Sequence, residues 1–333
     1  MRYVSTILVL FVFHAEMGMA GIKLDDKTAV VFASVEEGVN ILTSRDDFVQ
    51  RLSPFDRAAR MKTTEYVSGE RYLEFVSKNV LEWNKDEKTL VSDVFSDIAP
   101  LFKGLALPWP EKILIIKTSG EEEGGAAYSR ANAVVIPESM LNSDQSQNLQ
   151  RTVCHELFHV LSRKNPEWRD KLYQAIGFYK CKEIEFPPKF ASRKITNPDA
   201  PINDHCIKLK LGKDSVWAIP ILVSKSEKYD LARGGELFSY VSLGFLVLSK
   251  DNSAVPKNVT YDKNNFQIVD IDNVANFYEQ VGKNTQYIIH PEEILADNFA
   301  AMVLGYKNVP SPEIINKMKA VLNQSSQSRN PKP

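Results

Sequence analysis

The sequence contains the stretch His155-Glu156-Leu157-Phe158-His159. Around it, from Ser143 to Asn165, apolar residues recur at the spacing of an amphipathic helix. We predict that this helix begins at Ser143 or Asp144, either of which can cap it. It should end at Asn165, because Pro166 disfavours helical geometry in the residue before it. Two histidines four residues apart lie on one face of a helix, so both rings can reach one metal ion.

The residue types of this stretch favour zinc as the metal. Two imidazole nitrogens suit Zn²⁺, and a catalytic zinc site adds one further protein ligand and a water. Glu156 follows His155 directly, about 100° further round the helix, so its carboxylate can reach the water rather than the metal. The chain has only five histidines, which makes a chance occurrence of the pattern improbable. The sequence therefore predicts a zinc site with His155 and His159 as ligands.

A third ligand must come from another element, and the best candidate lies near the C-terminus. Glu293 and Asp297 lie one turn apart in the helix that Pro291 is expected to open. We predict that Glu293 binds the metal and that Asp297 accepts a hydrogen bond from a ligand imidazole. Glu292 is the nearest alternative ligand, and Glu236 is a weaker one.

An HExxH motif followed by an ExxxD motif resembles the gluzincin zinc metallopeptidases, the group that includes thermolysin. The resemblance covers the two motif helices. It implies that His155, His159 and Glu293 bind zinc and that Glu156 acts as general base and acid. Asp297 would support one of the two ligand histidines. The interval between His159 and Glu293 is much longer than in thermolysin.

The resemblance also implies a zincin-like α+β fold with a small mixed sheet and two motif helices. In such a fold an edge strand before the motif helix holds an extended peptide, and residues 124–136 occupy the matching place. An ordinary hairpin arm is the equal alternative. An oxyanion stabiliser is expected as well. We select His205, which follows Asp204, as the catalytic candidate, and His290 and Tyr128 are the other two.

The chain divides by composition into four parts. Residues 1–20 have the pattern of a signal peptide, with Arg2, an apolar run and small residues before Ala20. The run is shorter than the roughly 20 residues of a membrane helix, so we expect cleavage and a secreted or periplasmic protein. Residues 21–110 should form a mostly helical N-terminal region. Residues 111–322 should form the catalytic region, and the polar residues 323–333 a disordered tail.

Charge and cysteine content exclude several classes of protein. Lysine and arginine total 41 against 42 acidic residues, so no overall field would attract nucleic acid. Three cysteines are too few for a disulfide framework. Cys181 and Cys206 have spacing and context that allow a bridge, which the sequence leaves open. Cys154 is expected to be a small buried residue.

Together these patterns predict a secreted zinc metallopeptidase that hydrolyses peptide bonds in a peptide or protein substrate. We expect no nucleic-acid partner and no membrane insertion after signal cleavage. The alternative is an exported zinc-binding protein whose peptidase-like scaffold is not catalytic. An amidase or peptidoglycan hydrolase would use similar zinc chemistry. The chain lacks a Gly-x-Ser-x-Gly elbow, which argues against a serine nucleophile.

Overall fold

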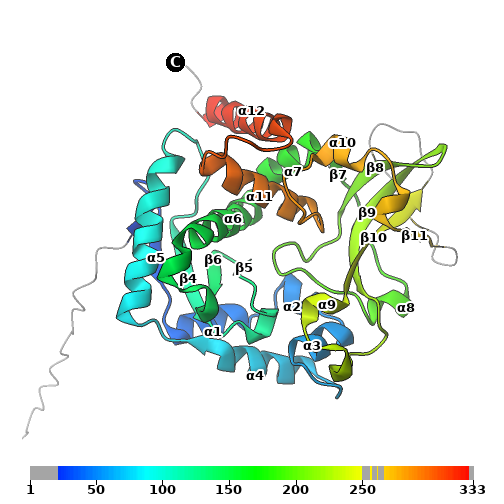
Figure 1. The fold of residues 1–333 in the computed structure, drawn as a ribbon, viewed down its shortest axis with the longest axis horizontal. Helices are drawn as coiled ribbons and strands as arrows, with labels where there is room; N and C mark the ends of the chain where they lie inside the picture. The colour runs from blue at the N-terminus through cyan, green and yellow to red at the C-terminus, as the bar shows by residue number, and fades with distance from the viewer. Residues whose placement is uncertain (1–21, 250–255, 257–260, 262–265, 330–333) are drawn as a thin grey trace, which may run out of the picture.

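Two β-sheets with helices packed around them make up the computed structural model, which describes residues 22–249, 256, 261 and 266–329 (Figure 1). This is the mixed α and β architecture expected from the sequence. The predicted signal peptide, residues 1–20, lies outside the described residues. Within those residues, no helix is both long and apolar enough to cross a membrane.

The first sheet has the strand order β1-β2-β4-β6-β5, with β3 paired to the end of β4. The strands are β1 (Ile22–Lys23), β2 (Ala29–Phe32), β3 (Val80–Leu81), β4 (Lys112–Thr118), β5 (Tyr128–Arg130) and β6 (Ala133–Pro137). The three central strands β2, β4 and β6 run parallel, and β5 is an antiparallel edge. Nearly every residue of β4 and β6 is buried, as expected for parallel strands covered on both faces.

Alternate residues of the central strands face different helices. Ile113 and Ile115 belong to the same core as α5 (Lys85–Ile98) and α6 (Ser146–Lys164). Leu114 and Ile116 belong to the core on the other face, under α1 (Val35–Leu42) and α4 (Gly69–Asn79). The twofold alternation of a strand thus produces a three-layer arrangement.

The helix that carries the HExxH stretch is α6. Its end before Asn165 is confirmed. Its start is later than predicted, because Ser143–Gln145 form a separate 3-10 turn and the helix begins at Ser146, so neither Ser143 nor Asp144 caps it. Three helices pack against it: α5, α7 (Pro166–Ala175) and α11 (Pro291–Val303). Helix α12 (Pro312–Arg329) packs on α7 and α11. In Figure 1, α6 and α11 lie side by side. Helix α11 begins at Pro291, as predicted, and brings its first turn to α6.

The second sheet is antiparallel throughout, with the order β11-β10-β9-β8-β7. Its strands are β7 (Phe178–Lys180), β8 (His205–Leu211), β9 (Asp214–Ser224), β10 (Val241–Ser249) and β11 (Ile268–Val269). A short helix, α9 (Leu237–Tyr240), leads directly into β10 at Val241. The sheet lies beside the helical layers (Figure 1).

The N-terminal region is mostly helical, as expected. Besides α1, α4 and α5 it contains α2 (Asp47–Arg51) and α3 (Pro54–Arg60). However, β2 pairs directly with β4, which lies beyond residue 110. Val30 and Phe95 also share one core with Leu157 of α6. The region before residue 110 is therefore part of the same sheet and core as the motif helix.

Two further expectations concern the C-terminal tail and the pair Cys181 and Cys206. Helix α12 continues to Arg329, past the predicted beginning of a disordered tail at Asn323. No glycine or proline interrupts the chain between Asn323 and Arg329, so nothing local stops the helix there.

Cys181 and Cys206 are both free thiols. They are close enough to hydrogen-bond, and this bond lowers the pKa of Cys181. Two short helices, α8 (Pro188–Ala191) and α10 (Phe277–Val281), complete the α-helices of the described residues.

Candidate metal centre

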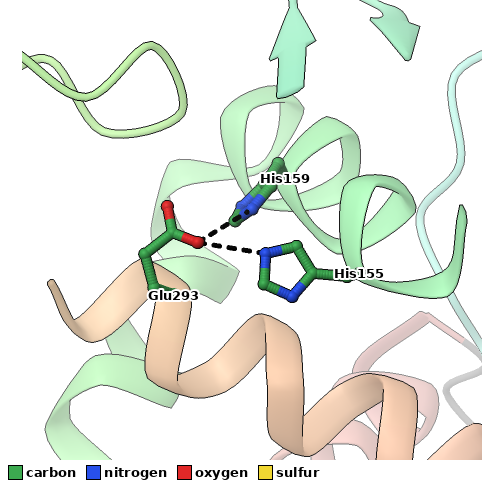
Figure 2. Close-up of side chains that lie close together, drawn as sticks. All are labelled: His155, His159 and Glu293. Carbon is green, nitrogen blue, oxygen red and sulfur yellow. Dashed lines mark hydrogen bonds and ion pairs between the residues drawn. The ribbon is translucent and has the colours of Figure 1, made fainter. Parts of the chain in front are cut away.

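Helices α6 and α11 bring His155, His159 and Glu293 together (Figure 2). Glu293 Oε2 lies 3.0 Å from His155 Nε2 and 3.5 Å from His159 Nε2. The two rings are edge to face, with their centroids 4.7 Å apart. All three residues are buried. Their donor atoms lie within 4.8 Å of one another, so the cluster can hold a metal ion.

The other nitrogen of each ring is bound to a carboxylate. His155 Nδ1 lies 3.0 Å from Asp297 Oδ1, and His159 Nδ1 lies 2.9 Å from Glu292 Oε1. If each Nδ1 carries the proton, each Nε2 presents its lone pair to the space in front of Glu293. His159 Nε2 is fully buried and lacks a hydrogen-bond partner of good geometry. An orphaned buried nitrogen of this kind fits a metal ligand.

Glu292, the alternative third ligand, contacts Nδ1 of His159, whereas Glu293 approaches Nε2. Glu292 accepts hydrogen bonds from Ser162 Oγ and Tyr173 Oη as well as contacting His159 Nδ1. All of its described partners therefore lie on the far side of the ring. Glu236, the weaker alternative, contacts Lys62 at the surface, 3.4 Å away. Neither residue is in the cluster.

Asp297 is held between several donors. Arg151 Nη2 donates to its Oδ1 at 2.6 Å, and Thr285 Oγ1 donates to its Oδ2. These contacts fix the carboxylate that holds His155. The placement agrees with the support expected for a ligand imidazole.

Glu156 projects from the same helix into the interior. It is 3 % exposed, and its Oε2 has no hydrogen-bond partner among the described residues. Burial raises the pKa of Glu156 to about 8, and the nearby charge of Asp199 acts in the same direction. Oxygen atoms of Glu156 and Asp199 and a nitrogen of His159 lie within 4.8 Å of one another. Glu156 is thus an unpaired acid beside the cluster.

The charges of the cluster are strongly coupled. Burial alone would lower the pKa of His155, but hydrogen bonds to Asp297 and Glu293 outweigh it and raise the pKa to about 9. Burial would likewise raise the pKa of Glu293, yet the adjacent His159 and His155 hold it well below its usual value. Without a metal, the His155 imidazole keeps its proton at neutral pH. Metal binding must displace that proton and weakens as the pH falls.

The structure does not bring His205 to the cluster. His205 Nε2 lies 3.2 Å from Asp170 and Nδ1 lies 2.6 Å from Asp204, so both ring nitrogens already have carboxylate partners. The ring packs edge-on against Tyr173. Tyr173 in turn contacts Glu292, which places His205 two side chains behind His159. The structure therefore places the predicted catalytic residue His205 away from the cluster, with both of its ring nitrogens engaged by carboxylates.

The other two oxyanion candidates are also engaged elsewhere. His290 caps α11, its Nδ1 accepting from the Glu292 amide at 3.1 Å, and burial lowers its pKa to about 4. Tyr128 lies on edge strand β5, but its hydroxyl donates to Glu122 at 3.1 Å. Both side chains are buried.

Three residues at the centre had not been singled out from the sequence. Asn197 Nδ2 donates to Glu293 Oε1 at 2.6 Å, and Asp199 approaches His159 and Glu156. The Tyr287 ring lies 6.2 Å from the His155 ring. Burial and the charges of Glu293 and Asp199 raise the pKa of Tyr287. All three are loop residues, and no periodic spacing marks them.

A cavity of about 380 Å³ lies next to the cluster. Asn197, Asp199 and Tyr287 line it on the polar side, and Ala126 and Ala127, just before β5, line it as well. The rest of the wall is mostly apolar and includes Leu222, Leu237, Phe238 and Leu243. The arrangement offers an apolar side chain a place beside the candidate metal.

Comparison with protein-family models, with curated proteins and with solved structures found no match for the chain.

Proposed function

We propose that the protein is an exported zinc metallopeptidase of the gluzincin kind, with His155, His159 and Glu293 as the zinc ligands. One observation carries the proposal. Two buried imidazoles and a carboxylate converge from separate helices, with the unpaired carboxylate of Glu156 beside them. Two nitrogens and one carboxylate oxygen are a frequent ligand set of catalytic zinc.

When bound, zinc would polarise the scissile carbonyl and lower the pKa of a water molecule toward about 7. The chain's own residues then have distinct tasks. Glu156 accepts a proton from the attacking water and delivers it to the leaving amine. Its burial and lack of a fixed partner suit this role, since a carboxylate with a raised pKa both accepts and releases a proton near neutral pH.

Tyr287 is the best candidate for stabilising the charge that develops on the carbonyl oxygen. Its ring lies 6.2 Å from that of His155, and its side chain lines the cavity together with Asn197 and Asp199. A neutral phenol is a hydrogen-bond donor, and such donors stabilise an oxyanion. The raised pKa keeps Tyr287 protonated.

An extended peptide would lie along Ala126, Ala127 and the edge strand β5. It would have to replace the side-chain partners of the Ser129 main chain, which are Asp199 at the amide and Arg163 at the carbonyl. A large apolar side chain of the peptide would enter the adjacent cavity. The N-terminal segment, with its signal-peptide pattern, supports export to the periplasm or the exterior.

A second candidate function is an exported zinc-binding protein without turnover. The position of Asp199 favours it, because Asp199, Glu156 and His159 form a second group of side chains that could hold a metal ion. An ion held there would take Glu156 as a ligand and leave no free carboxylate to act as general base.

Replacement of Glu156 with glutamine tests the peptidase proposal. We expect Glu156→Gln to retain zinc but to lose about 100- to 10,000-fold in hydrolysis of unfolded protein substrates. Zinc content and peptide release would be measured on the same samples. Glu167→Gln makes the same chemical change at an exposed position of α7 and should leave both quantities unchanged. Undiminished hydrolysis by zinc-loaded Glu156→Gln would refute the role of Glu156.

A further inference from the structure

Residues 181–206 form a segment that leaves the second sheet, reaches the candidate metal centre and returns to the same sheet. Cys181 directly follows β7, and Cys206 is the second residue of β8. Between them, Asn197 Nδ2 donates to Glu293 Oε1 at 2.6 Å. The part of segment 181–206 that meets the metal centre is therefore carried by two ends that both lie in the sheet.

The two ends of segment 181–206 are paired with each other. Strands β7 and β8 are antiparallel neighbours, with Tyr179 opposite Cys206. The pairing continues just past β7, where Cys181 donates its amide to the Asp204 carbonyl at 2.8 Å. Because alternate residues of a strand face the same side, Cys181 projects from the same face as Tyr179, and so does Cys206. The two cysteines therefore lie on one face of the sheet, at neighbouring positions of paired strands.

That face of the sheet is apolar, and the two thiols meet on it. Cys206 is fully buried in a core with Trp217 and Ile219, and the partly exposed Cys181 packs against this core. Each thiol is the hydrogen-bond partner of the other. Cys154, the third cysteine of the chain, is buried on α6 in a different core. Cys181 and Cys206 are thus the two thiols that the fold brings together.

We propose that Cys181 and Cys206 are a disulfide-forming pair, and that their oxidation fastens the two ends of segment 181–206 together. One S–S bond forms between them, and the pair loses two protons and two electrons. The oxidant is a small-molecule or protein disulfide, whose own S–S bond breaks to give two thiols that take up the protons and the electrons. Proteins outside the cytosol meet such oxidants, so the exported chain of the proposed function would carry the bond.

The exposure of the two residues gives the order of the exchange. Cys181 is the thiol that an external disulfide can reach, and its hydrogen bond to Cys206 lowers its pKa. The thiolate is the form of cysteine that attacks a disulfide, so Cys181 forms the mixed disulfide with the oxidant first. Cys206 then attacks the sulfur of Cys181 and releases the second half of the oxidant as a thiol.

The position of the bond explains what it would stabilise. Strand β7 is the outer strand of its sheet and has only three residues, so few main-chain hydrogen bonds hold the first end of segment 181–206. A cross-link at this point joins the weakly held end to β8. It therefore supports the loop residues that reach the metal centre, among them Asn197.

Thiol counting in the full chain tests the bond without a metal or an activity assay. The protein is incubated with oxidised glutathione, unfolded in denaturant and treated with a maleimide. We expect one reactive thiol, that of Cys154, against three in a sample that was reduced beforehand. A peptide map of the oxidised sample should recover the peptides of Cys181 and Cys206 joined to each other. Three reactive thiols, lasting glutathione adducts or a bridge that includes Cys154 would overturn the proposal.

Thermal unfolding tests whether the bond fastens segment 181–206. The oxidised chain should unfold at a temperature about 5 to 10 °C higher than the reduced chain, because a cross-link restricts the unfolded state. Cys181→Ser is the matched control, since it removes the partly exposed partner and leaves the buried Cys206 in place. A reductant should not change the unfolding temperature of this variant. Equal temperatures for the oxidised and reduced unaltered chain would refute the fastening.

These measurements separate the inference from the proposed function. A chain without peptidase activity that shows the joined peptides and the higher unfolding temperature would support the disulfide and count against the peptidase. A chain that hydrolyses peptides but keeps three reactive thiols after oxidation would refute the disulfide and leave the peptidase proposal standing.

Discussion

At the scale of single residues, the centre depends on side chains that do not touch the metal position. Each ligand imidazole is fixed at Nδ1 by its own carboxylate, Asp297 for His155 and Glu292 for His159. Glu292 is 1 % exposed and is further bound by Ser162 and Tyr173. Such partners set the tautomer and the basicity of a ligand ring.

Glu292→Gln should therefore weaken metal binding although Glu292 is not a ligand. A neutral amide stabilises the imidazole less than a carboxylate does, and we expect zinc affinity to fall about 10- to 100-fold. Competition with a chelator measures the change, and circular dichroism checks the fold. Glu313→Gln, at an exposed position of α12, should leave the affinity unaltered. Equal affinities for the two variants would contradict the role assigned to Glu292.

Spacing along one helix made part of this centre predictable. His155, Glu156 and His159 share a single helix, and Glu293 and Asp297 share another, so their relative positions follow from helical geometry. Asp199, Asn197 and Tyr287 come from loops whose paths depend on tertiary contacts. Glu292 is a rival ligand on sequence grounds because a sequence shows which acids lie close to a motif along the chain. It does not show which nitrogen of the imidazole ring each acid contacts.

At the scale of elements, local signals placed the helix starts well. Ser53 and Ser68 cap α3 and α4, each accepting a hydrogen bond from an amide of the first turn, and serine is among the residue types that favour this position. Strand pairing was not accessible in this way. The pairing of β2 with β4 joins segments separated by several helices, and nothing in either segment specifies its partner.

The packing of α1 on the first sheet gives a prediction at this scale. A Cβ atom on Gly38 would lie 2.8 Å from Val80 Cγ1 and 3.1 Å from Ile116 Cγ2. Alanine is the better helix former by about 0.5–1 kcal/mol, but overpacking a core costs about 1–3 kcal/mol. We expect Gly38→Ala to lower the free energy of unfolding by about 1 kcal/mol in urea denaturation.

Gly69 provides the matched control in α4. A Cβ atom there would meet nothing within 4 Å, so Gly69→Ala should leave the stability unchanged or slightly raised. If Gly38→Ala were as stable as Gly69→Ala, α1 would not pack as closely on β3 and β4 as the structure has it.

At the scale of the whole molecule, one buried ion-pair network joins distant parts of the chain. Arg60 of α3 pairs with Asp56 at 2.5 Å and with Glu123, just before β5, at 2.7 Å. It also binds the Thr196 carbonyl in the loop that carries Asp199. The N-terminal region therefore contributes to the position of Asp199 beside His159 and Glu156. The high helix content before residue 110 suggested a domain boundary there. A sequence does not show which distant segments form ion pairs, so these connections could not be predicted.

Arg60→Met should be strongly destabilising for this reason. It leaves the carboxylates of Asp56 and Glu123 buried without their cation, and breaking a buried pair in this way costs about 3–5 kcal/mol. Urea denaturation measures the loss. Arg71→Met removes an exposed ion pair with Glu65 and should have little effect, because solvent screens such pairs. Similar stabilities for the two variants would show that the Arg60 network is not structurally important.

Both sheets finish in very short outer strands. The first is bounded by the two-residue β1 and the three-residue β5, and the second by the two-residue β11 and the three-residue β7. The long strand β9 lies between β8 and β10, and β11 pairs with Phe245 and Leu246 of β10. Unpaired main-chain groups along a sheet margin are templates for aggregation, and short margins present few of them. Folded molecules of this protein should resist association through their strands even when they are crowded together.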